Sequence, residues 1–306
     1  MTNKKHILVT GANGQLGMEL KAIASTYPQY HFLFSTKEEL PIEDADAVKK
    51  YFAQQQIDFC INCAAYTAVD KAETEKEQAF LINGTAVGEL ASVCKLNNTQ
   101  LIHISTDYVF NGEACTPYKE TDPTSPISIY GESKLKGEQL ALLNDPSSII
   151  IRTSWLYSSY GNNFVKTMFR LMAERESINV VNDQWGCPTN AEDLAETIMK
   201  MIEKIEQGKK RDKKEDATIF HFCNDGKISW FDFATTIKEL IHSNCEIRPI
   251  PSSAYQTAAK RPAYSVLDTR KVKRVFDIHT KDWKASLKFF ILKLSMDTFP
   301  GRFFGQ

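Results

Sequence analysis

Apolar runs and amphipathic stretches alternate along the first half of the chain. Short apolar runs cover four segments, at residues 5–10, 31–35, 57–64 and 100–105. Stretches with helical spacing lie between them, at residues 15–25, 45–55 and 75–95. Such alternation with short connections is typical of βαβ units in a parallel sheet. The third and fourth runs are almost continuously apolar, as in strands buried on both faces. We therefore expect an α/β fold with a Rossmann-like, doubly wound parallel sheet.

The second half alternates less regularly. A polar, proline-containing stretch at 111–126 interrupts the pattern, and a Lys/Glu-rich stretch at 203–216 is predicted to be a solvated loop. Helical spacing resumes in five segments, at residues 130–143, 163–176, 191–206, 230–242 and 283–294. Strand-like runs cover residues 148–157 and 218–223. A length of 306 residues suits two domains, or one large α/β domain with an appended lobe.

The charge balance excludes some classes of protein. Because 37 Lys and Arg stand against 38 Asp and Glu, the basic excess of a general nucleic-acid or anionic-membrane binder is missing. The sequence has no apolar run of about 18 residues, so no membrane-spanning helix is predicted. The first residues lead directly into a strand-like run, so no signal peptide is expected. We predict a cytoplasmic protein that binds neither nucleic acid nor membrane.

The cysteines and histidines predict no metal or redox centre. Seven cysteines are scattered along the chain and are expected to be free thiols in a reducing compartment. Cys60 and Cys63 form a C-x-x-C motif, but it closes an apolar run, so a packing role is favoured over a redox role. No second Cys or His pair completes a zinc site. His103 lies inside an apolar run and is expected to be a satisfied core residue.

Three glycines follow the first predicted strand. Gly11, Gly14 and Gly17 stand between this strand and a helix. Their spacing suits a tight turn, a close approach of backbone to a pyrophosphate, and close packing of helix on strand. The helix N-terminus adds unpaired N–H groups and a positive dipole end. We therefore predict a dinucleotide-binding loop. The binding domain is expected to comprise residues 1–158 plus 190–224, and a smaller C-terminal α/β substrate lobe residues 159–189 plus 225–306.

The end of the second predicted strand bears on the cofactor. An acid for the ribose 2′-hydroxyl of NAD is expected about 20 residues after the loop. Here the strand ends at Ser35, Thr36 and Lys37, whose hydroxyls and ammonium suit a 2′-phosphate. NADPH is therefore favoured. Glu38 follows directly, so NADH stays open.

A tyrosine and a lysine four residues apart form the candidate catalytic pair. Tyr130 and Lys134 share one face of a predicted helix. A nearby ammonium stabilises a phenolate, which makes the phenol a better acid toward a developing alkoxide. Thr106 ends the fourth strand-like run, at the edge where a parallel sheet presents ligand contacts. Its hydroxyl is predicted to bind the same carbonyl oxygen.

These motifs resemble the extended short-chain dehydrogenase/reductase superfamily and, within it, the dTDP-4-dehydrorhamnose reductase family. The resemblance covers most of the chain and rests on residues 10–17, 62–73, 105–110, 130–134, 152–155 and 261–262. It implies an NAD(P)H-dependent oxidoreductase. The implied reaction reduces the C4 ketone of dTDP-4-dehydro-L-rhamnose to dTDP-L-rhamnose, a nucleotide sugar for cell-surface polysaccharide biosynthesis.

The resemblance also implies cofactor contacts. The pyrophosphate is expected along Gly14, Gln15 and Leu16. The nicotinamide-side ribose and phosphate are expected beside Ala64, Ala65 and Tyr66. Two positions depart from the family: Pro41 replaces an Asp near the adenine, so that Ile42 is the predicted contact, and Tyr66 stands where some members have His. Both departures bear on the choice of cofactor.

The remaining roles concern substrate and catalysis. By resemblance, Tyr130 donates the proton, and Lys134 binds the ribose and tunes the tyrosine. The predicted sugar contacts are Thr106, Asp107 and Trp155, and Arg261 is predicted to face the nucleotide diphosphate. Some related reductases use Mg²⁺ at a dimer contact, but no ligand spacing identifies such a site here. Mg²⁺ and a homodimer both stay open.

Related proteins suggest alternatives. Sugar-nucleotide 4,6-dehydratases carry Thr-Asp-Glu where this chain has Thr106, Asp107 and Tyr108, and the missing carboxylate disfavours elimination. A nucleotide-sugar 4-epimerase needs only the tyrosine, the lysine and a hydroxyl, so it stays open. A non-catalytic NADP-binding regulatory subunit, of the kind that serves methionine adenosyltransferase, also stays open, although binding alone does not require all three side chains.

Overall fold

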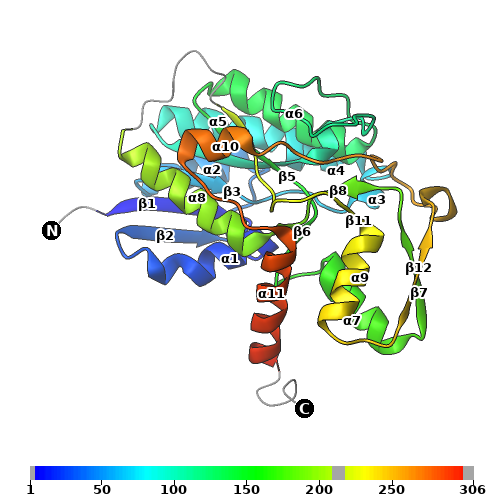
Figure 1. Ribbon diagram of the computed structural model, residues 1–306. Coiled ribbons are helices and arrows are strands. Elements are labelled where there is room, and N and C mark those ends of the chain that lie inside the picture. Colours follow the sequence, from blue (N-terminus) through cyan, green and yellow to red (C-terminus); the bar gives the residue numbers. More distant parts are fainter. Residues whose placement is uncertain (1–3, 209–217, 299–306) are drawn as a thin grey trace.

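Six parallel strands form the main sheet of the computed structural model, which describes residues 4–208 and 218–298 (Figure 1). The strands are β1 (Lys5–Thr10), β2 (Tyr30–Ser35), β3 (Phe59–Asn62), β4 (Gln100–Thr106), β5 (Ile149–Thr153) and β10 (Ile219–His221). Their order is β2-β1-β3-β4-β5-β10. After β1 the chain builds first toward β2 and then in the opposite direction through β3. Such a switch point opens a crevice at the carboxyl ends of the strands.

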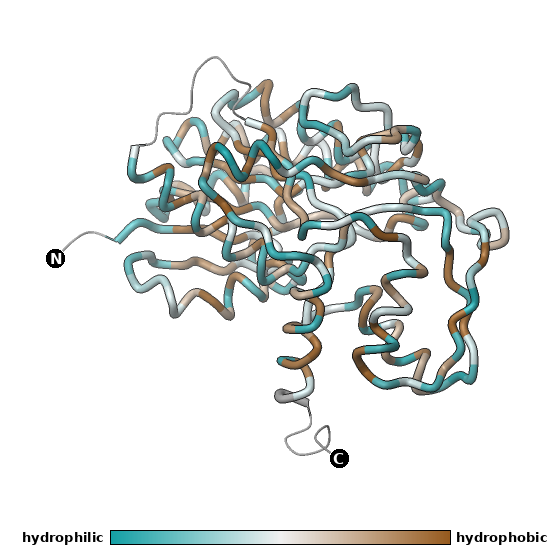
Figure 2. The backbone as a smooth tube through the Cα atoms, in the orientation of Figure 1, coloured by the Kyte–Doolittle hydropathy of each residue, from teal (hydrophilic) through white to brown (hydrophobic). Residues whose placement is uncertain are grey.

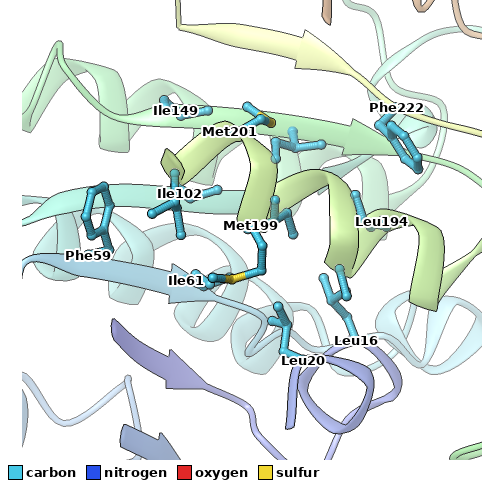
Figure 3. Close-up of a cluster of buried hydrophobic side chains, with 14 of the residues drawn as sticks. Leu16, Leu20, Phe59, Ile61, Ile102, Ile149, Leu194, Met199, Met201 and Phe222 are labelled. Atoms are coloured by element: carbon cyan, nitrogen blue, oxygen red, sulfur yellow. The ribbon is translucent and has the colours of Figure 1, made fainter. Parts of the chain in front are cut away.

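Helices cover both faces of this sheet, as the sequence predicts. One face carries α1 (Gln15–Ile23), α8 (Ala191–Glu206) and α10 (Arg270–Phe276), and the other carries α2 (Ala45–Gln54), α5 (Ala86–Leu96) and α6 (Ile129–Asn144). Successive strand residues supply opposite cores: Ile7 and Val9 join the first, and Leu8 joins the second. Figure 3 shows the first core, where Leu20 and Met199 pack toward Ile61 of the sheet. The doubly wound α/β fold is confirmed.

The connection from β3 to α5 is helical throughout most of its length. It contains α3 (Val69–Ala72), α4 (Lys76–Phe80) and a π-helical turn, η2 (Leu81–Thr85). The stretch Lys76–Leu96 is long and apolar enough to cross a membrane, but 61% of its apolar 18-residue window is buried inside the protein. This burial is the packing of a core helix, since Val87, Leu90 and Ala91 lie in the second core.

A smaller unit packs beside the sheet and has its own core. It contains α7 (Phe164–Glu174), α9 (Trp230–Leu240), α11 (Trp283–Thr298) and a parallel pair of strands, β7 (Ser177–Val181) and β12 (Glu246–Ile250). Hydrophobic segments recur in these helices (Figure 2), and Val165, Phe233 and Leu287 meet in their core. Two short pairings complete the sheets: β6 (Leu156–Tyr157) with β9 (Thr189–Asn190), and β8 (Trp185–Gly186) with β11 (Ile228–Ser229). The 3₁₀ turns are η1 (Ala24–Thr26), η3 (Asp107–Val109) and η4 (Ser252–Ala254).

The structure contains elements that the sequence pattern does not predict, among them β7, β12 and α10. β12 was not expected, because Pro249 interrupts its pattern; the strand has one strand neighbour, and a proline is tolerated at such an edge. α10 was also missed, since it is short and mostly basic. The sequence pattern places residues 203–206 both in the helix 191–206 and in the solvated loop 203–216; in the structure they end α8. Residues 209–216 of the predicted loop lie outside the described residues.

Candidate active site

A cavity of about 870 Å³ opens at the carboxyl ends of the central strands. The segments that follow β1, β3, β4 and β5 all contribute to its wall. The predicted site residues on this wall are Gly11, Gly14, Gln15, Leu16, Ile42, Ala64, Ala65, Tyr66, Thr106, Asp107, Tyr130, Lys134 and Trp155. Gly17 and Arg261 are not part of the wall. The cavity therefore brings together residues that are widely separated in the sequence.

The glycine loop is shaped by close backbone contacts. Gly11 has a φ of +64°, and a Cβ there would lie 2.6 Å from the Ala64 nitrogen. At Gly17 a Cβ would lie 2.6 Å from the Gly11 carbonyl oxygen, so this glycine packs helix on loop rather than facing the cavity. Gly14 is the N-cap of α1, and no side chain caps that helix end. Its first N–H groups are thus available to an anion.

The end of the cavity that is lined by the segment after β2 offers both a cation and an acid. Lys37 and Glu38 line it, and the Lys37 ammonium lies 3.5 Å from the Glu43 carboxylate. The predicted use of Ser35 is not supported, because this residue is buried and its hydroxyl donates to the Tyr51 hydroxyl at 3.3 Å. Ile42 packs in a small apolar cluster beside Ala64 and Tyr66. Lys37 is therefore the group at this end that can attract a 2′-phosphate.

The first turn of α6 holds Tyr130. Ser128 caps this helix by accepting a hydrogen bond from the Gly131 N–H at 3.2 Å. Gly131 allows the helix to approach η3, because a Cβ there would lie 2.3 Å from the Tyr108 carbonyl oxygen. The Tyr108 ring meets Tyr130 edge to face, with centroids 5.5 Å apart. The backbone thus fixes the phenol at the cavity wall, close to the end of β4.

The pKa of Tyr130 differs from the sequence expectation. Burial raises it to about 12; the neighbouring Thr106 hydroxyl opposes the rise and the Asp107 carboxylate adds to it. Lys134 is not among the groups that shift this pKa, and its ammonium donates to the Ile104 carbonyl oxygen at 2.7 Å. A phenol with a raised pKa stays protonated at neutral pH and still donates to an alkoxide, which is a far stronger base.

Lys134 is itself almost fully buried. Burial lowers its pKa to about 8, although the Glu138 carboxylate one turn later opposes the change. Glu138 is in turn held by Arg152, whose Nη2 lies 2.7 Å from Oε2, and by the Ser105 hydroxyl. Lys134 therefore borders the cavity and also belongs to a buried polar network behind its wall.

Asp107 has an incompletely paired carboxyl group on the cavity wall. Its Oδ1 accepts from the Thr106 hydroxyl at 3.1 Å, whereas its buried Oδ2 has no hydrogen-bond partner among the described residues. Burial raises the pKa of Asp107 to about 6, against the hydrogen bonds that lower it. A ligand hydroxyl group is the natural partner for such an oxygen.

Trp155 is clamped in an unusual backbone conformation. Its φ is +47°, which is rare for a bulky residue. The indole stacks on Trp230 with ring centroids 3.5 Å apart, and a Cβ on Gly186 would lie 2.4 Å from it. Contacts from the smaller unit thus hold this aromatic ring at the cavity wall.

Arg261 lies outside the cavity lining and forms an ion pair. Its Nη2 is 2.9 Å from the Asp70 carboxylate, which also accepts from the Ala259 N–H at 3.0 Å. Val69, which precedes Asp70, is part of the wall. The guanidinium is therefore close to the cavity rim, where it is held by a residue 191 positions away in the sequence.

The C-x-x-C motif and the histidines take structural settings. Cys60 is buried in β3, and Cys63 lies on the cavity wall after the end of that strand. His103 is fully buried, and burial holds its pKa well below the usual value. Within residues 4–208 and 218–298, no group of three or more His, Cys, Asp or Glu side chains is placed to hold a metal ion.

Sequence reasoning missed Asn83, which braces the wall from the π-helical turn. Its Oδ1 accepts from the Tyr66 N–H at 2.8 Å, and its Nδ2 donates to the Tyr66 carbonyl oxygen and to the Ser133 hydroxyl, each at 3.0 Å. It joins the segment after β3 to α6. No local pattern marks this residue, because its partners lie 17 and 50 positions away.

Comparison with known proteins agrees with this architecture. The family model described as RmlD substrate binding domain matches residues 5–296. A dTDP-4-dehydrorhamnose reductase of Aggregatibacter actinomycetemcomitans is 40% identical over 92% of this chain and 97% of its own length. A crystal structure of such a reductase from Clostridium acetobutylicum has a TM-score of 0.88 at 38% identity, covering 95% of this chain and all of that one. A Bacillus anthracis reductase in complex with NADP has the same TM-score and coverage at 36% identity.

Proposed function

The chain belongs to the RmlD substrate-binding domain family, and from this membership we propose that it is a dTDP-4-dehydrorhamnose reductase. The reaction is the NADPH-dependent reduction of the C4 ketone of dTDP-4-dehydro-L-rhamnose to dTDP-L-rhamnose. The observation that carries the proposal is the shared cavity of Thr106, Tyr130 and Lys134 with the glycine loop. We place the enzyme in the cytoplasm, in polysaccharide biosynthesis.

In this proposal, the cofactor site runs along one side of the cavity. The N–H groups at the start of α1, with Gly11, Gly14, Gln15 and Leu16, hold the pyrophosphate, and Gly17 keeps the helix close to the loop. Ala64, Ala65 and Tyr66 line the nicotinamide-side ribose, and Ile42 lies beside the adenine. When bound, the nicotinamide supplies the hydride.

Three side chains act on the ketone oxygen and its surroundings. Tyr130 gives its proton to the oxygen as negative charge develops there. Thr106 turns its hydroxyl proton from the Asp107 carboxylate to the same oxygen, and Lys134 binds the ribose from the cavity wall. Burial keeps the Tyr130 pKa at about 12, so the phenol carries its proton at neutral pH.

The substrate is held by groups around this centre. We assign the unpaired Oδ2 of Asp107 to a sugar hydroxyl, and the clamped indole of Trp155 to the face of the hexulose. Arg261 is assigned to the diphosphate, since a guanidinium matches phosphate oxygens in pairs. The site would thus lie between a binding domain of residues 1–158 plus 190–224 and a substrate lobe of residues 159–189 plus 225–306, with α10 of the latter range packed on the main sheet.

We assign NADPH rather than NADH as the physiological cofactor. The Lys37 ammonium at the cavity end supports this choice, and so does the NADP bound to the Bacillus anthracis reductase. Glu38 beside it weakens the preference rather than reversing it. Elimination is disfavoured, because Tyr108 occupies the position of the dehydratase carboxylate and burial raises the pKa of its phenol further.

The test is a direct assay of the purified chain. Incubation with dTDP-4-dehydro-L-rhamnose should oxidise NADPH faster than NADH and yield dTDP-L-rhamnose, identified by NMR. Interconversion of UDP-glucose and UDP-galactose with NAD⁺ would instead establish a 4-epimerase. Stoichiometric co-purification with a synthetase and no reductase activity would establish the regulatory subunit.

A further inference from the structure

A line of buried polar groups crosses the sheet beneath the cavity. It runs from Thr10 on β1 through Asn62 on β3 and His103 on β4 to Lys134 on α6. Each of these residues is at most 2% exposed. Thr10, Asn62 and His103 do not border the cavity, so their polar hydrogen atoms must be donated to protein acceptors, whereas Lys134 also faces the cavity.

The orientation of the Asn62 amide is fixed by a backbone group. The Ala64 N–H donates to one end of this amide at 3.1 Å, and the Thr10 hydroxyl reaches the same atom at 2.8 Å. A backbone N–H is only a donor, so the atom that it meets must be the carbonyl oxygen. The amide nitrogen of Asn62 therefore points the other way, toward His103.

This orientation fixes the tautomer of His103. The Asn62 Nδ2 lies 3.0 Å from the His103 Nδ1, and an amide nitrogen only donates, so Nδ1 must accept. A neutral imidazole carries one N–H, and burial keeps this ring neutral by lowering its pKa. The proton is therefore on Nε2. That N–H faces the Lys134 Nζ at 3.4 Å.

A donor that faces a lysine favours one form of the lysine. A protonated ammonium has no lone pair, whereas a neutral amine can accept the Nε2–H. We propose that His103 is a positioning residue that presents this N–H to Lys134 and thereby promotes release of the lysine proton near neutral pH. The role in turnover rests on the proposed reductase function. The tautomer and its effect on the lysine are properties of the free protein.

The other groups around Lys134 do not remove this effect. On α6 the Glu138 carboxylate favours the ammonium, but Glu138 is shared with Arg152 from β5. Also on α6, Tyr130 is a neutral phenol near pH 7. At the end of β3 the Cys63 thiol is kept neutral because burial raises its pKa. Burial lowers the Lys134 pKa to about 8, so small changes at His103 move its titration through the accessible pH range.

Tautomer and titration can be measured without activity. In cofactor-free protein labelled with ¹⁵N-histidine and ¹³C-lysine, NMR reports the protonated ring nitrogen of His103 and the titration midpoint of Lys134. His103→Gln and Lys134→Met identify the two signals. We expect the Nε2–H tautomer and a lysine midpoint well below the ordinary value. An Nδ1–H tautomer would overturn the proposal, whatever the activity of the enzyme.

Two variants test the link between His103 and Lys134 in different ways. His103→Asn keeps an acceptor for Asn62 but no longer reaches Lys134, and should raise the lysine midpoint by about one pH unit. Asn62→Asp offers only acceptors, so it should move the histidine proton to Nδ1 and also raise the midpoint. An unchanged midpoint in both folded variants would refute the proposal.

A matched control separates this effect from simple loss of a buried ring. His221 is equally buried but lies against the Tyr118 carbonyl oxygen and Arg152. Because His221 reaches Lys134 only through the Arg152–Glu138 pair, His221→Asn should move the Lys134 midpoint much less than the His103 and Asn62 variants do. If the chain is a reductase, the alkaline limb of the plot of kcat against pH should shift with the Lys134 titration midpoint in the His103 and Asn62 variants. A limb that stays fixed while the midpoint moves would refute the role in turnover.

Discussion

The two ends of the candidate site are built in different ways. At the glycine end, residues close together in the sequence shape the cavity through backbone contacts, such as the approach of Gly17 to the Gly11 carbonyl oxygen. At the tyrosine end, side chains from β4, α6 and the smaller unit are held by partners far away in the sequence, as Arg261 is by Asp70. The glycine end depends on steric fit, whereas the tyrosine end depends on reactive and charged side chains. Substitutions at the two ends should therefore impair different properties of the protein.

The largest effect on chemistry is expected at the tyrosine end. Tyr130→Phe removes the proton donor and should lower kcat by about 10²–10⁴-fold, while NADPH binding and folding change little. Stopped-flow reduction and fluorescence titration with NADPH measure the two quantities. Tyr157→Phe is a control, since Tyr157 is buried away from the cavity lining. Equal losses in both variants would remove Tyr130 from its assigned role.

A substitution at the glycine end should impair both folding and cofactor binding. Gly11→Ala places a Cβ 2.6 Å from the Ala64 nitrogen in a backbone with a φ of +64°. We expect the free energy of unfolding to fall by about 3 kcal/mol and NADPH binding to be lost. Gly208 has a φ of +67°, and a Cβ there would meet no atom of the described residues within 4 Å. In Gly208→Ala the free energy of unfolding should therefore fall by only about 1 kcal/mol. Chemical denaturation of both variants then gives the cost of the steric clash as the difference between them.

A buried acid at the tyrosine end should reduce stability at neutral pH. The Asp107 pKa is raised from 3.8 to about 6, so its favourable contribution is complete below pH 3.8 and is lost as the pH rises through 6. Asp107→Asn should therefore increase the free energy of unfolding by about 2–3 kcal/mol above that window, and have little effect below it. Denaturation at two pH values measures this difference. An equal effect at both would contradict the raised pKa.

The smallest effect is expected at the cavity rim. Arg261→Gln removes a phosphate-binding fork and leaves the Asp70 carboxylate without its cation, so KM for the nucleotide sugar should rise about tenfold with a smaller change in kcat. Steady-state kinetics measures both. Arg270 forms a comparable pair with Asp268, at 2.5 Å, away from the cavity wall. If Arg270→Gln raised KM as much, the Arg261 effect would not be specific.

Several features of the fold follow from local sequence. β1 and α8 have the bounds that periodicity predicts, because alternation on a strand and spacing on a helix record which face is buried. β12 was missed, since its proline pattern becomes a strand only beside β7. Within the site, the glycine spacing and the pair Tyr130 and Lys134 were identifiable, whereas Asn83 was not, because its importance lies in partners on other elements.

The sequence alone determined the α/β class, the glycine turn and the candidate catalytic side chains, because steric demands and periodic burial act between near neighbours. The tertiary structure decided how those side chains are tuned. Burial raises the Tyr130 pKa and lowers that of Lys134, and an amide on β3 sets the proton of a ring on β4. These properties depend on the exclusion of water and on groups many residues apart, so they exist only once the sheet and its helices have assembled.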